Sequence, residues 1–84
     1  MSWTAFITST ADRHLKRLPQ DAYARIRTTI DKMELNPWSG DIEKLEGTDH
    51  WRRRVGNYRI KFRLLRNKHL LYIYEIERRT STTY

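Results

Sequence analysis

A chain of 84 residues with a formal net charge of +7 has room for one small hydrophobic core, so we expect a single domain over residues 1–84. The absence of cysteine excludes disulfides and thiolate chemistry. No stretch approaches the ~18 apolar residues of a membrane span, and the apolar run near the N-terminus is too short for a signal peptide. We therefore expect a cytoplasmic location and no membrane partner.

The first part of the sequence predicts a strand and a helix. Residues 3–8 alternate weakly between apolar and polar side chains, which is typical of a short strand. Ser9 or Thr10 is a suitable N-cap for the helix that follows. The apolar face of this helix carries Ala11, Leu15 and Leu18.

A second helix is predicted between Pro19 and Asn36. Proline suits the first turn of a helix, and the Asn36-Pro37 pair ends one. Because the connection is so short, the two helices should form an antiparallel hairpin. The apolar stripe of the second helix consists of Tyr23, Ile26, Ile30 and Met33.

Residues 38–50 predict a loop, and the hydrophobic period becomes two from Trp51 onward. Three strands are expected, over residues 51–55, 58–65 and 70–76. Gly56-Asn57 separates the first two, and Asn67-Lys68 is a plausible two-residue hairpin turn between the last two. The predicted fold class is therefore α+β, in which an N-terminal strand precedes a helical hairpin packed on one face of a small antiparallel sheet.

The hairpin turn at Asn67-Lys68 predicts which side chains share a face of the sheet. It places a core face of Ile60, Phe62, Leu64, Leu71 and Ile73 under the helices. Glu75 should lie near the end of this core face, in an ion pair with Arg53. The opposite face offers phosphate contacts and stacking surfaces together, and we expect it to bind RNA. It carries Arg59, Lys61 and Arg63 beside Tyr72 and Tyr74, with Arg52 and Arg54 from the neighbouring strand.

The charge is concentrated in the same region. Residues 1–50 contain seven basic and eight acidic residues, a balance of −1. Residues 51–84 contain ten basic and two acidic residues, a balance of +8. A surplus this concentrated indicates a polyanionic partner.

Several motifs occur in an order that resembles a known family. The stretch HWRRRVGNYRIKF follows LPQDAYARIRTTIDKMELNP and KLEG. Together they resemble the RelE/ParE toxin superfamily of type II toxin–antitoxin systems, whose pattern includes K-L-x-G, W-R-x-R-V-G-x-Y-R and a C-terminal arginine segment that ends in tyrosine. The resemblance covers nearly the whole chain, from Trp3 to Tyr84, and implies a RelE-like fold related to the microbial ribonucleases.

The resemblance implies a toxin that inhibits translation as a ribosome-dependent mRNA endoribonuclease, with the ribosome and mRNA as partners. It also implies a cognate antitoxin that wraps and neutralises the toxin. Two alternatives share the fold: a ParE-like inhibitor of DNA gyrase and a non-catalytic RNA-binding relative. Fold alone does not decide between them.

The resemblance also implies a set of site residues. Arg52 and Arg54 match two basic residues of one strand, and Arg59 matches the arginine after the tyrosine of the next. Arg78 matches the C-terminal arginine, although its neighbour Arg79 fits as well and is otherwise expected to bind RNA. Tyr84 matches the terminal tyrosine.

The chain differs from RelE at the first basic pair, because RelE has lysines where this chain has Arg52 and Arg54. Arginine stays protonated and is a poor general base. Glu43 is a candidate general base, by similarity to the glutamate of YoeB toxins, and His50 is another candidate near the site. No His, Asp and Glu cluster has metal-ligand spacing, so we expect no metal and no cofactor.

Overall fold

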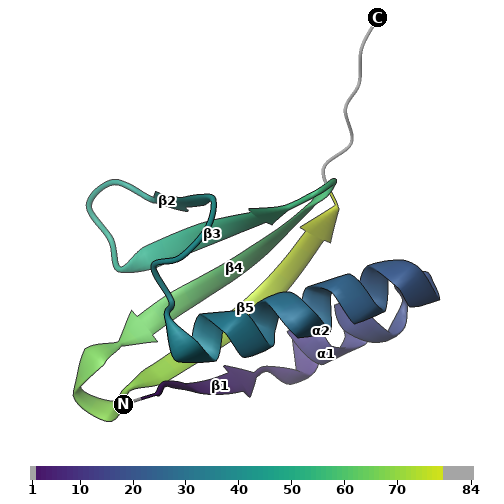
Figure 1. The fold of residues 1–84 in the computed structure, drawn as a ribbon. Helices are drawn as coiled ribbons and strands as arrows, with labels where there is room; N and C mark the ends of the chain where they lie inside the picture. Colours follow the sequence, from purple (N-terminus) through teal and green to yellow (C-terminus); the bar gives the residue numbers. More distant parts are fainter. Residues whose placement is uncertain (1, 79–84) are drawn as a thin grey trace, which may run out of the picture.

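Within residues 2–78, five strands form one sheet in the order β1-β5-β4-β3-β2, and two helices cover one face of it (Figure 1). The computed structural model describes residues 2–78. Neighbouring strands are antiparallel except β1 and β5, which are parallel. The expected α+β architecture is confirmed. The strands are β1 (Thr4–Ile7), β2 (Ile42–Lys44), β3 (His50–Val55), β4 (Tyr58–Leu65) and β5 (Leu70–Arg78).

The helices α1 (Ser9–Lys16) and α2 (Gln20–Leu35) begin close to the predicted positions. The N-cap of α1 is Thr8 rather than Ser9 or Thr10, because the amide of Ala11 donates to Thr8 Oγ1 at 3.1 Å. Pro19 directly precedes α2, as expected. Neither helix is long and apolar enough to cross a membrane, among the residues described.

The core lies between the helices and the covered face of the sheet. The predicted stripes are confirmed except at Leu18, which lies past the end of α1 and is half-buried against the core, and at Tyr23, which is 42% exposed. Burial of the apolar surface in this layer is the main source of stability. The fully buried large side chains include Leu15, Ile26, Ile30 and Met33 from the helices and Ile60, Phe62, Leu71 and Ile73 from the sheet.

The register of the β4–β5 hairpin is confirmed near its turn. Leu65 pairs with Leu70 and Phe62 with Ile73. The turn itself differs from the expected two-residue loop. A short 3₁₀ segment over Arg66–Lys68 leads into His69, which has a left-handed φ of 50°.

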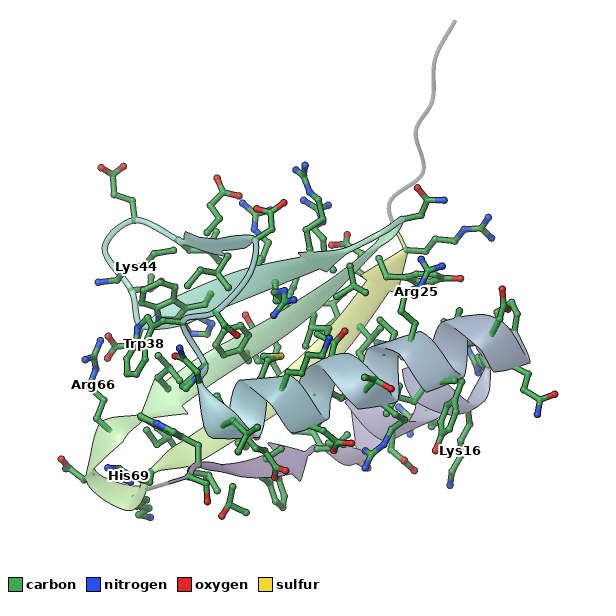
Figure 2. All side chains as sticks on the ribbon, in the orientation of Figure 1. Lys16, Arg25, Trp38, Lys44, Arg66 and His69 are labelled. Atoms are coloured by element: carbon green, nitrogen blue, oxygen red, sulfur yellow. The ribbon has the colours of Figure 1, made fainter. Side chains whose placement is uncertain are left out.

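Aromatic contacts hold this turn against the rest of the molecule. The ring of His69 stacks on Trp3 at 4.8 Å, and Trp3 meets Trp38 edge-on at 5.6 Å. The guanidinium of Arg66 lies 5.7 Å from the centre of the Trp38 ring (Figure 2). A cation over an indole face is electrostatically favourable.

A β-bulge changes the register farther from the turn. The shift occurs between Lys61 and Phe62, so that Lys61 pairs with Glu75 and Tyr74 is the extra residue of β5. The expectation that Glu75 lies on the core face, paired with Arg53, is therefore wrong. Glu75 Oε1 lies 3.3 Å from Lys61 Nζ, while Arg53 Nη1 donates to the carbonyl oxygen of Ser39 at 3.0 Å.

The segment predicted as a loop over residues 38–50 contains the short strand β2. Its three residues pair with β3, and Glu43 lies opposite Arg52. Three residues are too few to show a period of two in the sequence, which explains why this strand was not predicted.

Candidate functional site

The sheet face turned away from the helices, called here the open face, carries most of the predicted RNA-binding residues. The register of β3 against β4 sets His50 opposite Arg63, Arg52 opposite Lys61, and Arg54 opposite Arg59. Because side chains alternate along a strand, these six lie on the side opposite Ile60 and Phe62. The predicted row of cations therefore lies together on one face.

Carboxylates accompany four of these five lysine and arginine side chains, which the sequence did not lead us to expect. The nitrogen–oxygen distances are 3.2 Å for Arg52–Glu43, 3.9 Å for Arg54–Asp41, 3.2 Å for Arg59–Glu77, and 3.3 and 3.4 Å for Lys61 to Glu75 and Glu77. Two of the acids come from the segment predicted as a loop, and two follow the bulge. The open face is thus a mixed field of charges rather than a purely basic one.

Arg63 differs from its neighbours, because within residues 2–78 it has no ion-pair partner. Three open-face arginines also have a buried Nε–H without a hydrogen-bond partner among those residues: Arg52, Arg59 and Arg63. A buried donor without an acceptor costs about 1–3 kcal/mol. An oxygen-rich anion on this face would supply the missing acceptors, and the planar arginine fork suits phosphate oxygens.

His50 and Tyr74 form a hydrogen bond within this field of charges. The distance from His50 Nδ1 to the Tyr74 hydroxyl is 2.8 Å, and the two rings meet edge-on at 5.3 Å. Burial raises the pKa of the Tyr74 hydroxyl, although Lys61, Arg63 and Arg52 act in the opposite direction. The phenol therefore keeps its proton at neutral pH.

An aromatic pair completes the open face at the β1 edge. Phe6 lies beside Tyr72 in the parallel register, and their rings stack at 5.6 Å with an angle of 12°. Phe6 is 50% exposed. A stacked pair with one exposed ring, next to Arg63, provides a surface on which a base can stack. Phe6 was missed because its position beside Tyr72 depends on the pairing of β1 with β5, for which the sequence carries no local signal.

The remaining predicted site residues are not gathered on the open face. Arg78 pairs with Tyr58, which packs against the core, so the alternation of β5 places Arg78 on the helix side. The structure does not bring it together with Arg52 and Arg59. Arg79 and Tyr84 lie outside the described residues.

Glu43 lies on the edge strand, beside Arg52. Its side chain is 69% exposed. A hollow of about 550 Å³ adjoins it, formed in part by Leu45, Gly47 and Arg52. Among residues 2–78, no group of His, Cys, Asp and Glu is arranged to hold a metal ion.

The chain is similar to solved toxin structures, although no family model and no curated protein matches its sequence. The archaeal RelE–RelB complex from Pyrococcus horikoshii OT3 aligns with a TM-score of 0.85 and 27% identity, over 98% of this chain and 100% of that one. The isolated RelE toxin of E. coli aligns with a TM-score of 0.83 and 12% identity, over 96% and 88%. The YoeB/ParE toxin from Agrobacterium tumefaciens aligns with a TM-score of 0.76 and 18% identity, over 92% and 99%.

Proposed function

This chain has the RelE/ParE-like toxin fold, and from that premise we propose that it is the toxin of a toxin–antitoxin pair that cleaves mRNA on the ribosome. The observation that carries the proposal is the gathering of Arg52, Arg59 and Arg63 on one sheet face with unpartnered, buried Nε–H groups. These donors fit a phosphodiester better than an apolar ligand. The neighbouring Phe6–Tyr72 stack suits an unpaired base.

The proposed reaction is attack by a ribose 2′-OH on the adjacent phosphorus. The new P–O2′ bond forms as the P–O5′ bond breaks, which leaves a 2′,3′-cyclic phosphate and a 5′-hydroxyl. Negative charge builds up on the non-bridging oxygens at the transition state. Preorganised arginine donors from β3 and β4 would stabilise that charge without reorganisation, and this is commonly the largest catalytic contribution.

Arg52, Arg54 and Arg59 are the proposed phosphate-stabilising residues. Lys61, Arg63, Tyr72 and Tyr74 would contact the RNA on either side of the reacting phosphate. Arg78, Arg79 and Tyr84 keep their proposed roles by resemblance alone, and for Arg78 the register of β5 argues against one. Glu43 remains a candidate general base at the edge of this face.

A cognate antitoxin is the proposed protein partner. Similar toxins from Pyrococcus horikoshii OT3 and Methanococcus jannaschii were solved in complex with RelB antitoxins. A segment that folds on binding and brings acidic side chains would satisfy the same arginine donors as RNA does. Such a segment would occupy the open face and exclude the substrate.

Primer extension on mRNA in translating ribosomes tests the proposal. The wild-type chain should produce breaks in the coding region that require ribosomes and disappear when antitoxin is added. Binding of RNA without any break would support the non-catalytic alternative. Accumulation of gyrase–DNA cleavage complexes, with intact mRNA, would support the ParE-like alternative and overturn the proposal.

A further inference from the structure

His50 and Tyr74 meet across an intervening strand. His50 is the first residue of β3 and Tyr74 belongs to β5, while β4 lies between these two strands in the sheet. Their hydrogen bond of 2.8 Å therefore passes over the open face of β4. A contact of this kind requires both side chains to lie over the sheet rather than project into solvent.

The β-bulge of β5 lies at Tyr74. The register shifts between Phe62–Ile73 and Lys61–Glu75, so Tyr74 is the residue without a direct partner on β4. A bulge bends its strand and re-aims the side chain of the extra residue, and bulges are frequent next to active sites. In this sheet it places the phenol beside the imidazole instead of directly opposite Lys61.

The His50–Tyr74 pair lies beside three cations of the open face. Arg63 lies directly opposite His50 on β4, and Arg52 is the next open-face residue along β3. Lys61, Arg63 and Arg52 all act electrostatically on the Tyr74 hydroxyl. A reacting phosphate held by Arg52, with Arg63 contacting the RNA beside it, would therefore lie within reach of the imidazole, and the ribose attached to that phosphate would lie beside it.

We propose that His50 Nε2 accepts the 2′-OH proton in the cleavage reaction and that Tyr74 is the positioning residue that holds the imidazole in the required tautomer. The proposal rests on the proposed function and supplies what the arginines lack, a nitrogen lone pair able to take a proton. In the required tautomer Nδ1–H donates to Tyr74 Oη, which leaves the lone pair of Nε2 free.

Protons and electron pairs balance in this step. The 2′-oxygen loses its proton to Nε2 and attacks phosphorus, while the P–O5′ pair leaves with the 5′-oxygen, which takes a proton from water. The resulting imidazolium donates through Nδ1 to Tyr74 and returns its proton from Nε2 to solvent. A general base in position contributes about 10²- to 10⁴-fold in rate.

The alternative base, Glu43, is less well placed. It lies on the edge strand β2, its side chain is 69% exposed, and Arg52 already binds it at 3.2 Å. His50 instead has a ring held on one side by Tyr74 and faces the arginine without a carboxylate partner, Arg63. Orientation by a second group is the arrangement that proton-transfer residues require.

Single-turnover cleavage of ribosome-bound mRNA tests the proposal, with binding to ribosomes measured separately. We expect His50→Gln to cut about 100-fold more slowly with unchanged ribosome affinity. We expect Tyr74→Phe to cut about 10-fold more slowly, and the double variant to be no slower than His50→Gln, because Tyr74 acts through His50. Added imidazole should restore part of the rate of His50→Ala. The matched controls, His69→Asn and Tyr23→Phe, should cut at the wild-type rate.

The outcomes separate this proposal from the function on which it rests. A wild-type chain that does not cleave would overturn both. A wild-type chain that cleaves, with His50→Gln equally fast or His50→Ala not rescued by imidazole, would overturn the role of His50 alone. Long-range ¹H–¹⁵N NMR should show the Nδ1–H tautomer in the wild type and its loss in Tyr74→Phe. An Nε2–H tautomer in the wild type would refute the role assigned to Tyr74.

Discussion

The carboxylate of Glu34 accepts a hydrogen bond of 2.8 Å from the backbone amide of Ala5. The carbonyl oxygen of the same glutamate accepts another from the amide of Trp3. β1 is an edge strand of the sheet, so these amides face away from β5 and would otherwise be open to another chain. The end of α2 thus closes the β1 edge.

Replacing Glu34 should weaken that closure. Glu34→Ala removes the acceptor and should lower the free energy of unfolding by about 1–2 kcal/mol. Glu34→Gln keeps a side-chain oxygen and should lose less than half as much. Urea denaturation measures both, and light scattering should show aggregation of the alanine variant. Equal stability of the two variants would show that the bond to Ala5 contributes nothing.

The carboxylate of Glu77 should compete with RNA for two cations of the open face. It lies 3.2 Å from Arg59 and 3.4 Å from Lys61. Neither of these contacts gives Glu77 Oε1 a well-aligned hydrogen bond. Glu77→Gln should raise the affinity for single-stranded RNA by about threefold to fivefold at low salt. Asp12→Asn makes the same change in net charge next to Lys16 on α1 and should change the affinity much less. Equal effects of the two variants would attribute the gain to net charge.

Loss of the Arg59 side chain should impair cleavage without unfolding the protein. Its ion pair with Glu77 is partly exposed, so Arg59→Ala should cost no more than about 1 kcal/mol of stability. Cleavage in the ribosome assay should fall about 100-fold, as when one transition-state donor is removed. Arg13→Ala, exposed on α1, is the matched control. A variant as active as the control would remove Arg59 from the site.

Alanine substitutions at Gly40 and Gly47 should distinguish the cost of a left-handed backbone from the cost of a steric collision. Their φ angles are similar, 81° and 77°. A Cβ at Gly47 would meet nothing, whereas at Gly40 it would collide with the guanidinium of Arg53. Gly47→Ala should therefore lose about 1–2 kcal/mol for the left-handed backbone. Gly40→Ala should lose more, because Arg53 must also release Ser39. Thermal unfolding at one pH compares them, and equal losses would refute the collision.

The hydrogen-bonded phenol of Tyr74 should make stability depend on alkaline pH. Burial raises its pKa in the folded state above the ordinary value of 10.0. The folded state therefore holds this proton more tightly, and the stabilisation, complete below pH 10, is lost as the pH rises through the folded pKa. As the pH is raised above 10, the Tyr74→Phe variant should therefore lose less stability than the wild type does. Urea denaturation at several pH values checks this, with Tyr23→Phe as the control.

The sequence predicted the hairpin pairing well where alternation was unbroken. Leu64 and Phe62 opposite Leu71 and Ile73 follow from burial of one face, since a slip by one residue would bury the arginines. The bulge at Tyr74 carries no glycine or other local signal, and it moved Glu75 to the open face. For the same reason the bond between Tyr74 and His50, two strands apart, could not be derived from residue spacing.

The sequence predicted the cations of the candidate site but not the carboxylates that accompany them. Arg52, Arg54 and Arg59 were expected on one face, and the register places them there. Their carboxylate partners were not expected, since Glu43 lies in a three-residue strand and Glu77 depends on the shifted register. The electrostatic potential of this face is therefore determined more by its cross-strand ion pairs than by the concentration of basic residues in the sequence.

The parallel pairing of β1 with β5 also governs when the molecule can fold. Thr4 pairs with Leu70 and Ile7 with Ile73, so β1 has no partner until β5 has been synthesised. Contacts this distant in sequence slow folding, because a long loop must close before they form. A nascent chain that stops before Leu70 leaves β1 without its partner and also lacks Tyr74. The edge strand β1 and the proposed proton-transfer pair thus both wait for the synthesis of β5.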